Sequence, residues 1–344
     1  MKENIKTFES DFKKKLLSSS AFNNVKNDDN GKQKLKVNST INKKDKYKIS
    51  IIIPTHNRLN QLTKLLNSIF SQKYTNYEII IIDDVSTDET NDFFTKLNED
   101  KIVYVRNEVN LGMGLNRQKG YKIATGDFII FCDDDDYYID NDYFGDAIKI
   151  FEDKKINLIC SSSYILYENE NKYSPYLLNF SSKIKAYDYL EKFQFDLLKP
   201  TSTFPLIIRK TVLEKANFKD MKMMNDSSIY LRSLMIGDYA FANDKIIGIY
   251  RVHNKNDTLN VKADFTIKNL QEKRYIYKYL KKKDVDFDLK EWYEKEIKIT
   301  VCHFLNGREK SKANRKKVLY WVLFNVSSKL FKELYKSEKE KNNI

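Results

Sequence analysis

Short apolar runs alternate with amphipathic stretches along the middle of the chain, and this alternation predicts strands joined by helices. Each run is continuously apolar and rich in β-branched residues, which is typical of a strand buried on both faces of a parallel sheet. Apolar residues recur at helical spacing between the runs. The pattern predicts strands at 48–54, 77–82, 102–105 and 127–132, and helices at 59–70, 86–97 and 114–124. The expected fold class is therefore α/β, with a mostly parallel sheet, helices on both faces and a C-terminal helical extension.

The second half of the chain has a less regular pattern. It predicts a helix at 146–157, strands at 158–165 and within 199–210, a helix at 227–237 and a strand at 246–253. Beyond residue 264 the sequence is rich in lysine and shows no strand signals. The expected organisation is a polar N-terminal extension (1–46), two halves of one α/β domain (47–145 and 146–263) and a basic helical region (264–344).

The chain of 344 residues carries a formal charge of +13, and the excess lies in its flanks. Residues 1–47 carry +6 and residues 264–344 carry +9, whereas residues 48–263 carry −2. The central region is therefore not a polyanion-binding domain, and we expect no nucleic-acid partner. The basic flanks suit an anionic membrane surface or an acidic polymer. A compositional bias toward Lys, Asn, Ile and Tyr is the alternative explanation.

The cysteines and the apolar runs indicate the cellular compartment of the protein. Cys132, Cys160 and Cys302 form neither a disulfide framework nor a metal-binding CxxC pair. No apolar run approaches the roughly 20 residues that a membrane-spanning helix needs, and the first residues lack the apolar segment of a secretory signal. We therefore expect a soluble cytoplasmic protein, with peripheral contact to the inner face of the cell membrane as a further expectation.

That contact would involve the C-terminal segment 316–336, which combines aromatic and aliphatic residues with flanking lysines. On a helix this segment could lie in a membrane interface, with Trp321 and Phe324 as anchors. The alternative is a helix packed on the catalytic domain or in a dimer interface.

Polar residues follow three of the predicted strands at the point where each strand ends. Residues 54–57 close the first strand, Asp83 and Asp84 the second, and the run Asp133–Asp136 the fourth. Because ligands of parallel sheets gather at the carboxyl ends of the strands, these side chains are expected to share one site.

The acidic run indicates a divalent cation. Four adjacent carboxylates repel one another, so they need a counter-charge, protonation or full solvation. Their hard oxygen atoms suit Mg²⁺ or Mn²⁺, which usually take one or two protein carboxylates together with substrate phosphates. A nucleoside diphosphate bridged to the chain by Mn²⁺ or Mg²⁺ is therefore expected. A solvated acidic turn is the alternative for this run, and plain helix capping is the alternative for Asp83 and Asp84.

Four segments in register resemble the donor half of a family 2 glycosyltransferase with the GT-A fold. They are IIIPTHNR (51–58), IIDDVSTDET (81–90), NLGMGLNRQKG (110–120) and GDFIIFCDDDD (126–136). The third has a GxG but lacks the last glycine of a dinucleotide-binding loop. The resemblance covers about 90 residues strongly, weakens toward residue 255 and reaches neither flank.

The resemblance implies roles for the residues around the nucleotide. Pro54, Thr55 and Asn57 would line the nucleoside pocket, and Asp83 would accept a hydrogen bond from the uracil N–H. Two further positions, near the base and the sugar phosphate, would be Asn110 and Arg117. The chain departs from the family pattern at Val85, where the family has glycine.

The resemblance also implies a metal motif. The D-x-D of the family corresponds to Asp133, Asp134 and Asp135, with Asp135 as the metal ligand and Asp133 on the ribose or the metal. Asp136 would lie near the donor sugar. The metal motif could also be shifted by one position along the run, because four aspartates are adjacent in the sequence.

The general base and two phosphate-binding residues are expected in the second half. MMNDSSIYLRSL (223–234) resembles the family segment that carries the base, so Asp226 is the candidate, although Asn225 stands where the family often has Glu. An ordinary helix N-cap is the alternative for Asp226. IYRVHNKNDT (249–258) resembles a segment in which Arg251 would meet the diphosphate and His253 the metal; a surface histidine is the alternative.

The resemblance therefore implies an inverting, metal-dependent glycosyltransferase, either a hexosyl- or an N-acetylhexosaminyltransferase. The donor would be a nucleotide sugar, expected to be UDP-linked, and the acceptor a bacterial surface glycan or a lipid-linked glycan of the cell envelope. One alternative is another enzyme that handles nucleotide sugars, such as a nucleotidyltransferase, which would release pyrophosphate. A second is a non-catalytic module that binds glycans or polyanions through the basic flanks.

Overall fold

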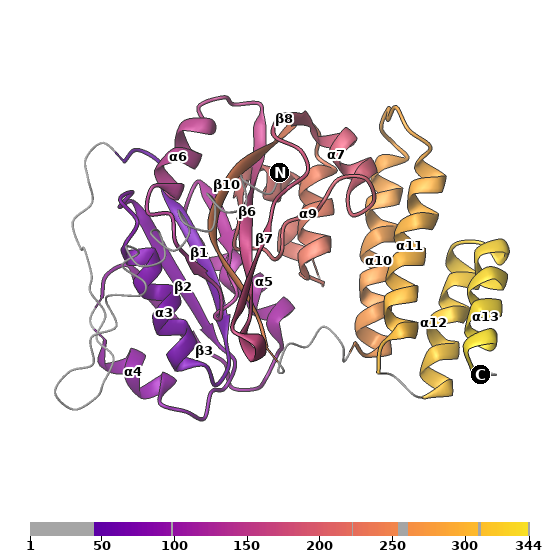
Figure 1. Ribbon diagram of the computed structural model, residues 1–344, viewed down its shortest axis with the longest axis horizontal. Helices are drawn as coiled ribbons and strands as arrows, with labels where there is room; N and C mark the ends of the chain where they lie inside the picture. The colour runs from indigo at the N-terminus through magenta and orange to yellow at the C-terminus, as the bar shows by residue number, and fades with distance from the viewer. Residues whose placement is uncertain (1–44, 98, 222, 254–260, 309–310, 343–344) are drawn as a thin grey trace.

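A ten-stranded mixed sheet forms the centre of the protein (Figure 1). The computed structural model describes residues 45–97, 99–221, 223–253, 261–308 and 311–342, so nearly all of the predicted N-terminal extension lies outside the described residues. The strands are β1 (Ile49–Thr55), β2 (Tyr77–Asp83), β3 (Ile102–Arg106), β4 (Phe128–Phe131), β5 (Tyr137–Tyr138), β6 (Ile156–Tyr167), β7 (Lys172–Tyr176), β8 (Ser182–Lys185), β9 (Leu206–Arg209) and β10 (Tyr239–Val252).

The sheet has a parallel half and a mixed half. Strands β3, β2, β1 and β4 lie side by side and are all parallel, as their continuous apolar runs predict. Strand β9 then runs antiparallel to both β4 and β6, and β6 is parallel to β10. The short strands β5, β7 and β8 pair antiparallel at the far side. The predicted α/β class is confirmed.

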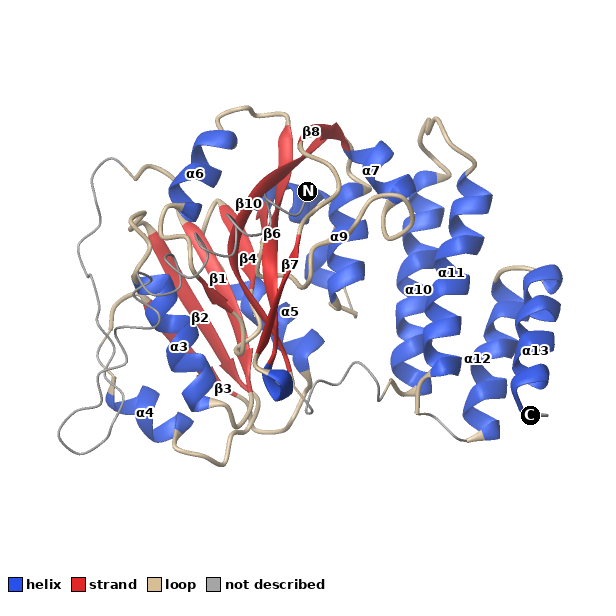
Figure 2. Ribbon diagram, viewed as in Figure 1, coloured by secondary structure: helices blue, strands red, loops and turns tan. Residues whose placement is uncertain are grey.

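Helices cover both faces of the sheet (Figure 2). Alternate residues of β1 face opposite cores: Ile51 and Ile53 pack with the helices of one face, and Ile52 packs with those of the other. The first face carries α3 (Leu59–Phe70), α4 (Thr90–Lys96) and α6 (Tyr143–Ile150). The second carries α5 (Met113–Ile123), α7 (Ala186–Lys192), α8 (Lys210–Lys215), η2 (Phe218–Asp220) and α9 (Asp226–Leu234). A short helix, η1 (Glu168–Glu170), follows β6.

Two predicted elements are wrong in their bounds. The helix expected at 146–157 ends at Ile150, and a turn closed by the Ile156 N–H and the Asp153 carbonyl leads directly into β6. The helix expected at 86–97 is shorter, because α4 begins at Thr90 and ends at Lys96. The Ser86 N–H donates to Asp83. The site described below depends on this contact.

Four helices form the C-terminal region beside the sheet (Figure 1): α10 (Ala263–Leu280), α11 (Leu289–Asn306), α12 (Lys312–Asn325) and α13 (Ser328–Asn342). A buried ion pair between Arg232 of α9 and Glu272 joins α10 to the α/β domain. The Trp292 indole N–H donates to the Leu190 carbonyl at 3.1 Å. No helix among the described residues is both long and apolar enough to cross a membrane.

Replacing Lys273 by alanine is expected to lower the free energy of unfolding by about 3–5 kcal/mol. Lys273 is 2% exposed and its ammonium pairs with Glu296, which is 0% exposed, so the change leaves a fully buried carboxylate without its cation. Urea denaturation would measure the loss, with Lys278→Ala on the exposed side of the same helix as the control. Equal free energies of unfolding for the two variants would contradict the burial of the Lys273–Glu296 pair.

Candidate active site

The carboxyl ends of β1, β2 and β4 meet at one edge of the sheet, as the sequence predicts. Thr55 lies opposite Asp83 in the parallel register of β1 and β2, and the acidic run follows β4 directly. The buried Thr55 hydroxyl donates to Asp134 at 2.8 Å. Pro54 precedes it inside β1 and is buried. The strand-end residues therefore form one connected cluster.

A hydrogen-bonded frame joins the loops that follow β1 and β2. Asn57 has a left-handed backbone with φ of 55°, its N–H donates to the Ser86 hydroxyl, and its side-chain oxygen accepts from the Thr87 N–H at 2.6 Å. Asp83 is fully buried and accepts from the Ser86 N–H at 2.8 Å and the Tyr104 hydroxyl at 2.6 Å. The frame fixes the two loops at the mouth of the site.

Asp84 fixes the loop that precedes α5. Its carboxylate accepts from the N–H groups of Leu111 and Gly112 and from the Asn107 amide, each at 2.8 Å. These hydrogen bonds hold the pKa of Asp84 below its usual value, against the effect of its burial. Asn110 donates to the Asp84 carbonyl at 3.4 Å, so it lies beside the same loops.

Arg58 bridges two carboxylates of the acidic run, a role that we did not assign from the sequence. Its Nη1 donates to Asp134 and to Asp135, both at 2.9 Å. Burial raises the pKa of Asp134 to about 7, although Arg58 opposes the shift. The sequence holds one signal for this role: Arg58 directly follows the strand-end motif, at the last position of IIIPTHNR.

Arg117 joins the acidic run to the predicted base. Its side chain is 0% exposed, with Nη2 2.5 Å from Asp133 and Nη1 3.0 Å from Asp226, and it also donates to the Met224 carbonyl. Burial raises the pKa of Asp133 to about 6, and the Arg117 cation opposes that shift. The neighbouring Gly120 lets α5 approach β1, since an added Cβ would collide with the Ile52 side chain.

Asp226 is the first residue of α9 and does not cap the helix. Asn225 is the N-cap, and its side chain accepts from the Ser228 N–H at 3.1 Å. The Asp226 side chain is 29% exposed, so its carboxylate reaches both Arg117 and solvent. A carboxylate in the first turn is stabilised in its ionised form by the helix dipole.

The remaining acidic residue, Asp136, is held by the second half of the domain. It accepts from the Ser202 hydroxyl at 2.8 Å and from the Arg251 N–H at 3.2 Å, and burial raises its pKa. The Arg251 guanidinium pairs with Glu168 of η1. Ser202 belongs to the segment that precedes β9, and Glu168 gave no signal in the sequence.

Asp135 and His253 form the pair that could hold a metal ion. The His253 Nε2 lies 2.9 Å from Asp135 Oδ2. Among the described residues, no group of three or more His, Cys, Asp and Glu side chains is arranged to hold a metal. A pair is sufficient for a Mg²⁺-like ion whose other ligands are substrate phosphates and water. The pair therefore fits such an ion if the ion displaces Arg58, which donates to the same Asp135 oxygen.

Replacing Arg58 by alanine is expected to lower the free energy of unfolding by about 2 kcal/mol without divalent cations, because Asp134 and Asp135 lose their shared counter-charge. Mn²⁺ should restore part of the loss. Urea denaturation in EDTA and in Mn²⁺ would measure both effects, with Lys64→Ala on the exposed side of α3 as the control. The prediction is contradicted if both variants lose the same stability in EDTA.

A family model matches just under half of the chain. Residues 50–215 match the family model "Glycosyl transferase family 2". The UDP-Glc:alpha-D-GlcNAc-diphosphoundecaprenol beta-1,3-glucosyltransferase WfaP of Escherichia coli is 36% identical over 117 residues, covering 34% of this chain and 46% of that protein. The GalNAc(5)-diNAcBac-PP-undecaprenol beta-1,3-glucosyltransferase of Campylobacter jejuni is 27% identical over 213 residues, covering 61% of this chain and 66% of that protein. The chain thus spans less than two thirds of these relatives.

The fold has close parallels among solved structures. The crystal structure of S. aureus TarS 1-349 in complex with UDP-GlcNAc superposes with a TM-score of 0.62 at 18% identity, covering 82% of each chain. The same protein in complex with UDP gives a TM-score of 0.54 at 19% identity, over 80% of this chain and 78% of that one. These neighbours share the GT-A-like α/β fold. Residues 50–215 are therefore similar to glycosyl transferase family 2, and the solved structures show the fold of the chain.

Proposed function

We propose that the chain is an inverting, metal-dependent glycosyltransferase that moves a sugar from a UDP-sugar to a hydroxyl group of a lipid-linked bacterial glycan. One observation carries the proposal: the buried Arg117 contacts Asp133 of the acidic run and Asp226 of α9 at once. The carboxylates suited to a metal-bound diphosphate and the candidate base therefore lie in one site. A binding module would gain nothing from this arrangement.

Asp226 is proposed as the general base. It takes the proton from the acceptor hydroxyl while that oxygen attacks the anomeric carbon of the donor. The bond between the anomeric carbon and the diphosphate oxygen breaks on the opposite face, and the nucleoside diphosphate leaves with the bonding electrons. A single displacement of this kind inverts the anomeric configuration.

Asp135 and His253 are proposed to hold Mn²⁺ or Mg²⁺. The ion would neutralise charge on the leaving diphosphate. Asp133 lies beside this pair in the run and would face the ribose, and Asp136 would face the donor sugar. Arg251 reaches the diphosphate only if its guanidinium leaves Glu168.

The nucleoside pocket is proposed at the frame of the first two loops, lined by Pro54, Thr55 and Asn57. Each Asp83 carboxylate oxygen has two lone pairs and accepts one described hydrogen bond, so it could also accept from the uracil N–H once the buried carboxylate is opened to the ligand. Two similar proteins support UDP: the WfaP relative is named for UDP-Glc, and the S. aureus neighbour was solved with UDP-GlcNAc.

The acceptor is proposed to be a lipid-linked glycan, reached from the inner face of the membrane. Both relatives above are named for undecaprenol-diphosphate-linked substrates.

Residues 312–342 of α12 and α13 carry nine Lys and Arg against three Glu, and Phe324 is 79% exposed beside Tyr320. Trp321, expected as an anchor, packs against the helical core instead, so Tyr320 takes its place. Sedimentation with phosphatidylglycerol vesicles, for wild type and Phe324→Ala, tests this contact.

A nucleotide panel tests the donor site. Thermal shifts with UDP, dTDP, GDP and CMP, with and without Mn²⁺, should show stabilisation by UDP that requires the metal. Stabilisation by another nucleotide would reassign the donor. The absence of a metal-dependent shift with every nucleotide would refute the donor site and leave the basic flanks as the binding region.

A further inference from the structure

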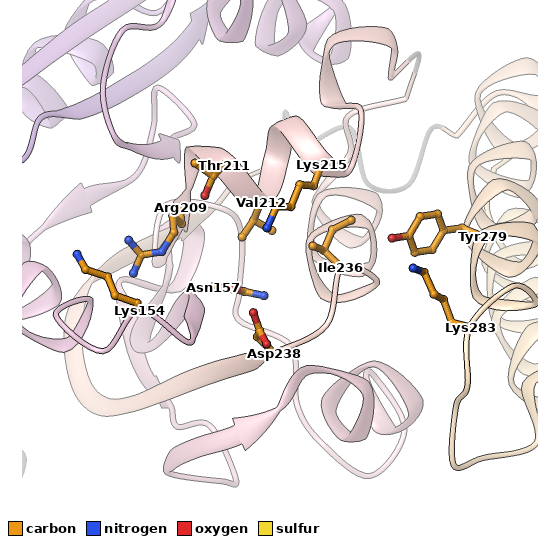
Figure 3. Close-up of a pocket in the computed structure, with 10 residues that line it drawn as sticks. All are labelled: Lys154, Asn157, Arg209, Thr211, Val212, Lys215, Ile236, Asp238, Tyr279 and Lys283. Atoms are coloured by element: carbon orange, nitrogen blue, oxygen red, sulfur yellow. The ribbon is translucent and has the colours of Figure 1, made fainter.

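A basic pocket lies between the α/β domain and α10, away from the candidate active site (Figure 3). Its volume is about 460 Å³, within the range of small-ligand pockets. It is lined by Lys154, Asn157, Arg209, Thr211, Val212, Lys215, Ile236, Asp238, Tyr279 and Lys283.

The pocket lies at the amino-terminal edge of the sheet. Arg209 ends β9 and pairs with Phe128, the first residue of β4. Ile156 and Tyr239, the first residues of β6 and β10, start at the same edge. The acidic run follows the opposite end of β4. The two sites are therefore separated by at least the length of that strand, roughly 13 Å for four residues.

The charge of the pocket is unbalanced. It is lined by three lysines and one arginine but by a single carboxylate, that of Asp238. Within the described part of the chain, none of Arg209, Lys215 and Lys283 forms an ion pair. The Lys154 ammonium donates to the Tyr47 hydroxyl at 2.8 Å, a neutral partner. An anion in the pocket would therefore meet cations that take part in no ion pair among the described residues.

Arg209 is held in place independently of any ligand. Its Nη2 donates to the carbonyls of Phe151 at 3.0 Å and Ile156 at 3.2 Å. Its guanidinium lies 5.2 Å from the Phe128 ring centroid and 5.0 Å from that of Phe151. Burial lowers the pKa of Arg209, which still stays charged at neutral pH. The side chain is thus a half-buried, preorganised cation that forms no ion pair with a described carboxylate.

We propose that this pocket is a second ligand site, which binds a phosphate or diphosphate group apart from the donor nucleotide. The Nε and Nη2 of Arg209 already donate to backbone carbonyls, so its Nη1 would meet a phosphate oxygen, and lysines bind phosphate as point charges. Lys215 belongs to α8 and Lys283 follows α10, so a group held by both would also bridge the α/β domain and the helical region (Figure 3). The Thr211 hydroxyl at the rim is a further donor.

Calorimetric titration of the full chain with inorganic diphosphate in EDTA tests the proposal. EDTA removes the divalent cation, so the metal-dependent donor site should not bind diphosphate under these conditions. Wild type should bind, and the double variant Lys215→Ala/Lys283→Ala should bind at least about tenfold more weakly. Both lysines are exposed, so the fold is kept. The matched control Lys64→Ala/Lys96→Ala removes the same charge from exposed positions elsewhere and should bind like wild type.

No binding by wild type, or equal weakening in both double variants, would overturn the proposal. The Mn²⁺-dependent shift with UDP should be the same in wild type and in both variants, which separates this site from the donor site. Sedimentation with phosphatidylglycerol vesicles identifies the source of the group. Weaker sedimentation of the pocket variant than of its control assigns the phosphate to a lipid, and equal sedimentation assigns it to a soluble ligand.

Discussion

Asp226→Asn is expected to lower kcat for sugar transfer by about 10²–10⁴-fold, the usual contribution of a general base. Asparagine keeps the size of the side chain and one oxygen toward Arg117, but it cannot take the proton from the acceptor hydroxyl. The affinity for UDP in the presence of Mn²⁺ should change by no more than about twofold, because Asp226 is not assigned to the donor. Steady-state kinetics and nucleotide titration would separate the two effects.

The matched control is Asp264→Asn, which changes a carboxylate in the first turn of α10 that is exposed and pairs with Lys317. This variant should keep the wild-type kcat. A wild-type kcat in Asp226→Asn would place the base elsewhere. A parallel loss of kcat and nucleotide affinity would show that the residue supports the site through Arg117 alone.

Asp135→Asn is expected to abolish the Mn²⁺-dependent part of UDP binding, with a loss of affinity of about 100-fold or more. The amide keeps the shape of the side chain, but it is neutral and binds a hard cation weakly. His253 alone would then remain of the pair that faces the metal. Titration with UDP at fixed Mn²⁺, and again in EDTA, would measure the metal-dependent term.

Asp142→Asn is the control for this variant, because Asp142 carries an exposed carboxylate that pairs with Lys73 outside the site. It should bind UDP like wild type in both conditions. If Asp135→Asn keeps the full Mn²⁺ dependence while Asp134→Asn loses it, the metal register is shifted by one position. If neither variant loses it, the metal is held by other residues.

The parallel half of the sheet could be predicted because each strand is an uninterrupted apolar run followed by polar residues. Strands β5, β7 and β8 gave no such signal, since they are two to five residues long and their antiparallel pairing depends on neighbours distant in sequence. The bounds of α6 were wrong for a related reason. The helix predicted at 146–157 included Ile156, but a turn at Asp153 places this residue at the start of β6.

The candidate site, too, could be predicted only in part. The position of its carboxylates followed from the strand ends, and the structure brings Thr55 and Asp134 into contact as expected. The ion pairs that connect the site could not be predicted, because Arg117 and Asp226 are 109 positions apart. Arg117 was expected to approach the donor, whereas the structure buries it between Asp133 and Asp226. Its role as a ligand contact stays a prediction.

The most direct test of the proposed activity is to incubate wild type with UDP-Glc or UDP-GlcNAc, Mn²⁺ and a lipid-linked glycan, and to analyse both products. We expect one UDP released for each sugar transferred and an inverted anomeric configuration in the new linkage by NMR. Release of pyrophosphate would indicate a nucleotidyltransferase, and retention of the anomeric configuration would contradict single displacement with Asp226 as the base. The absence of transfer, with donor binding intact, would contradict the proposed acceptor.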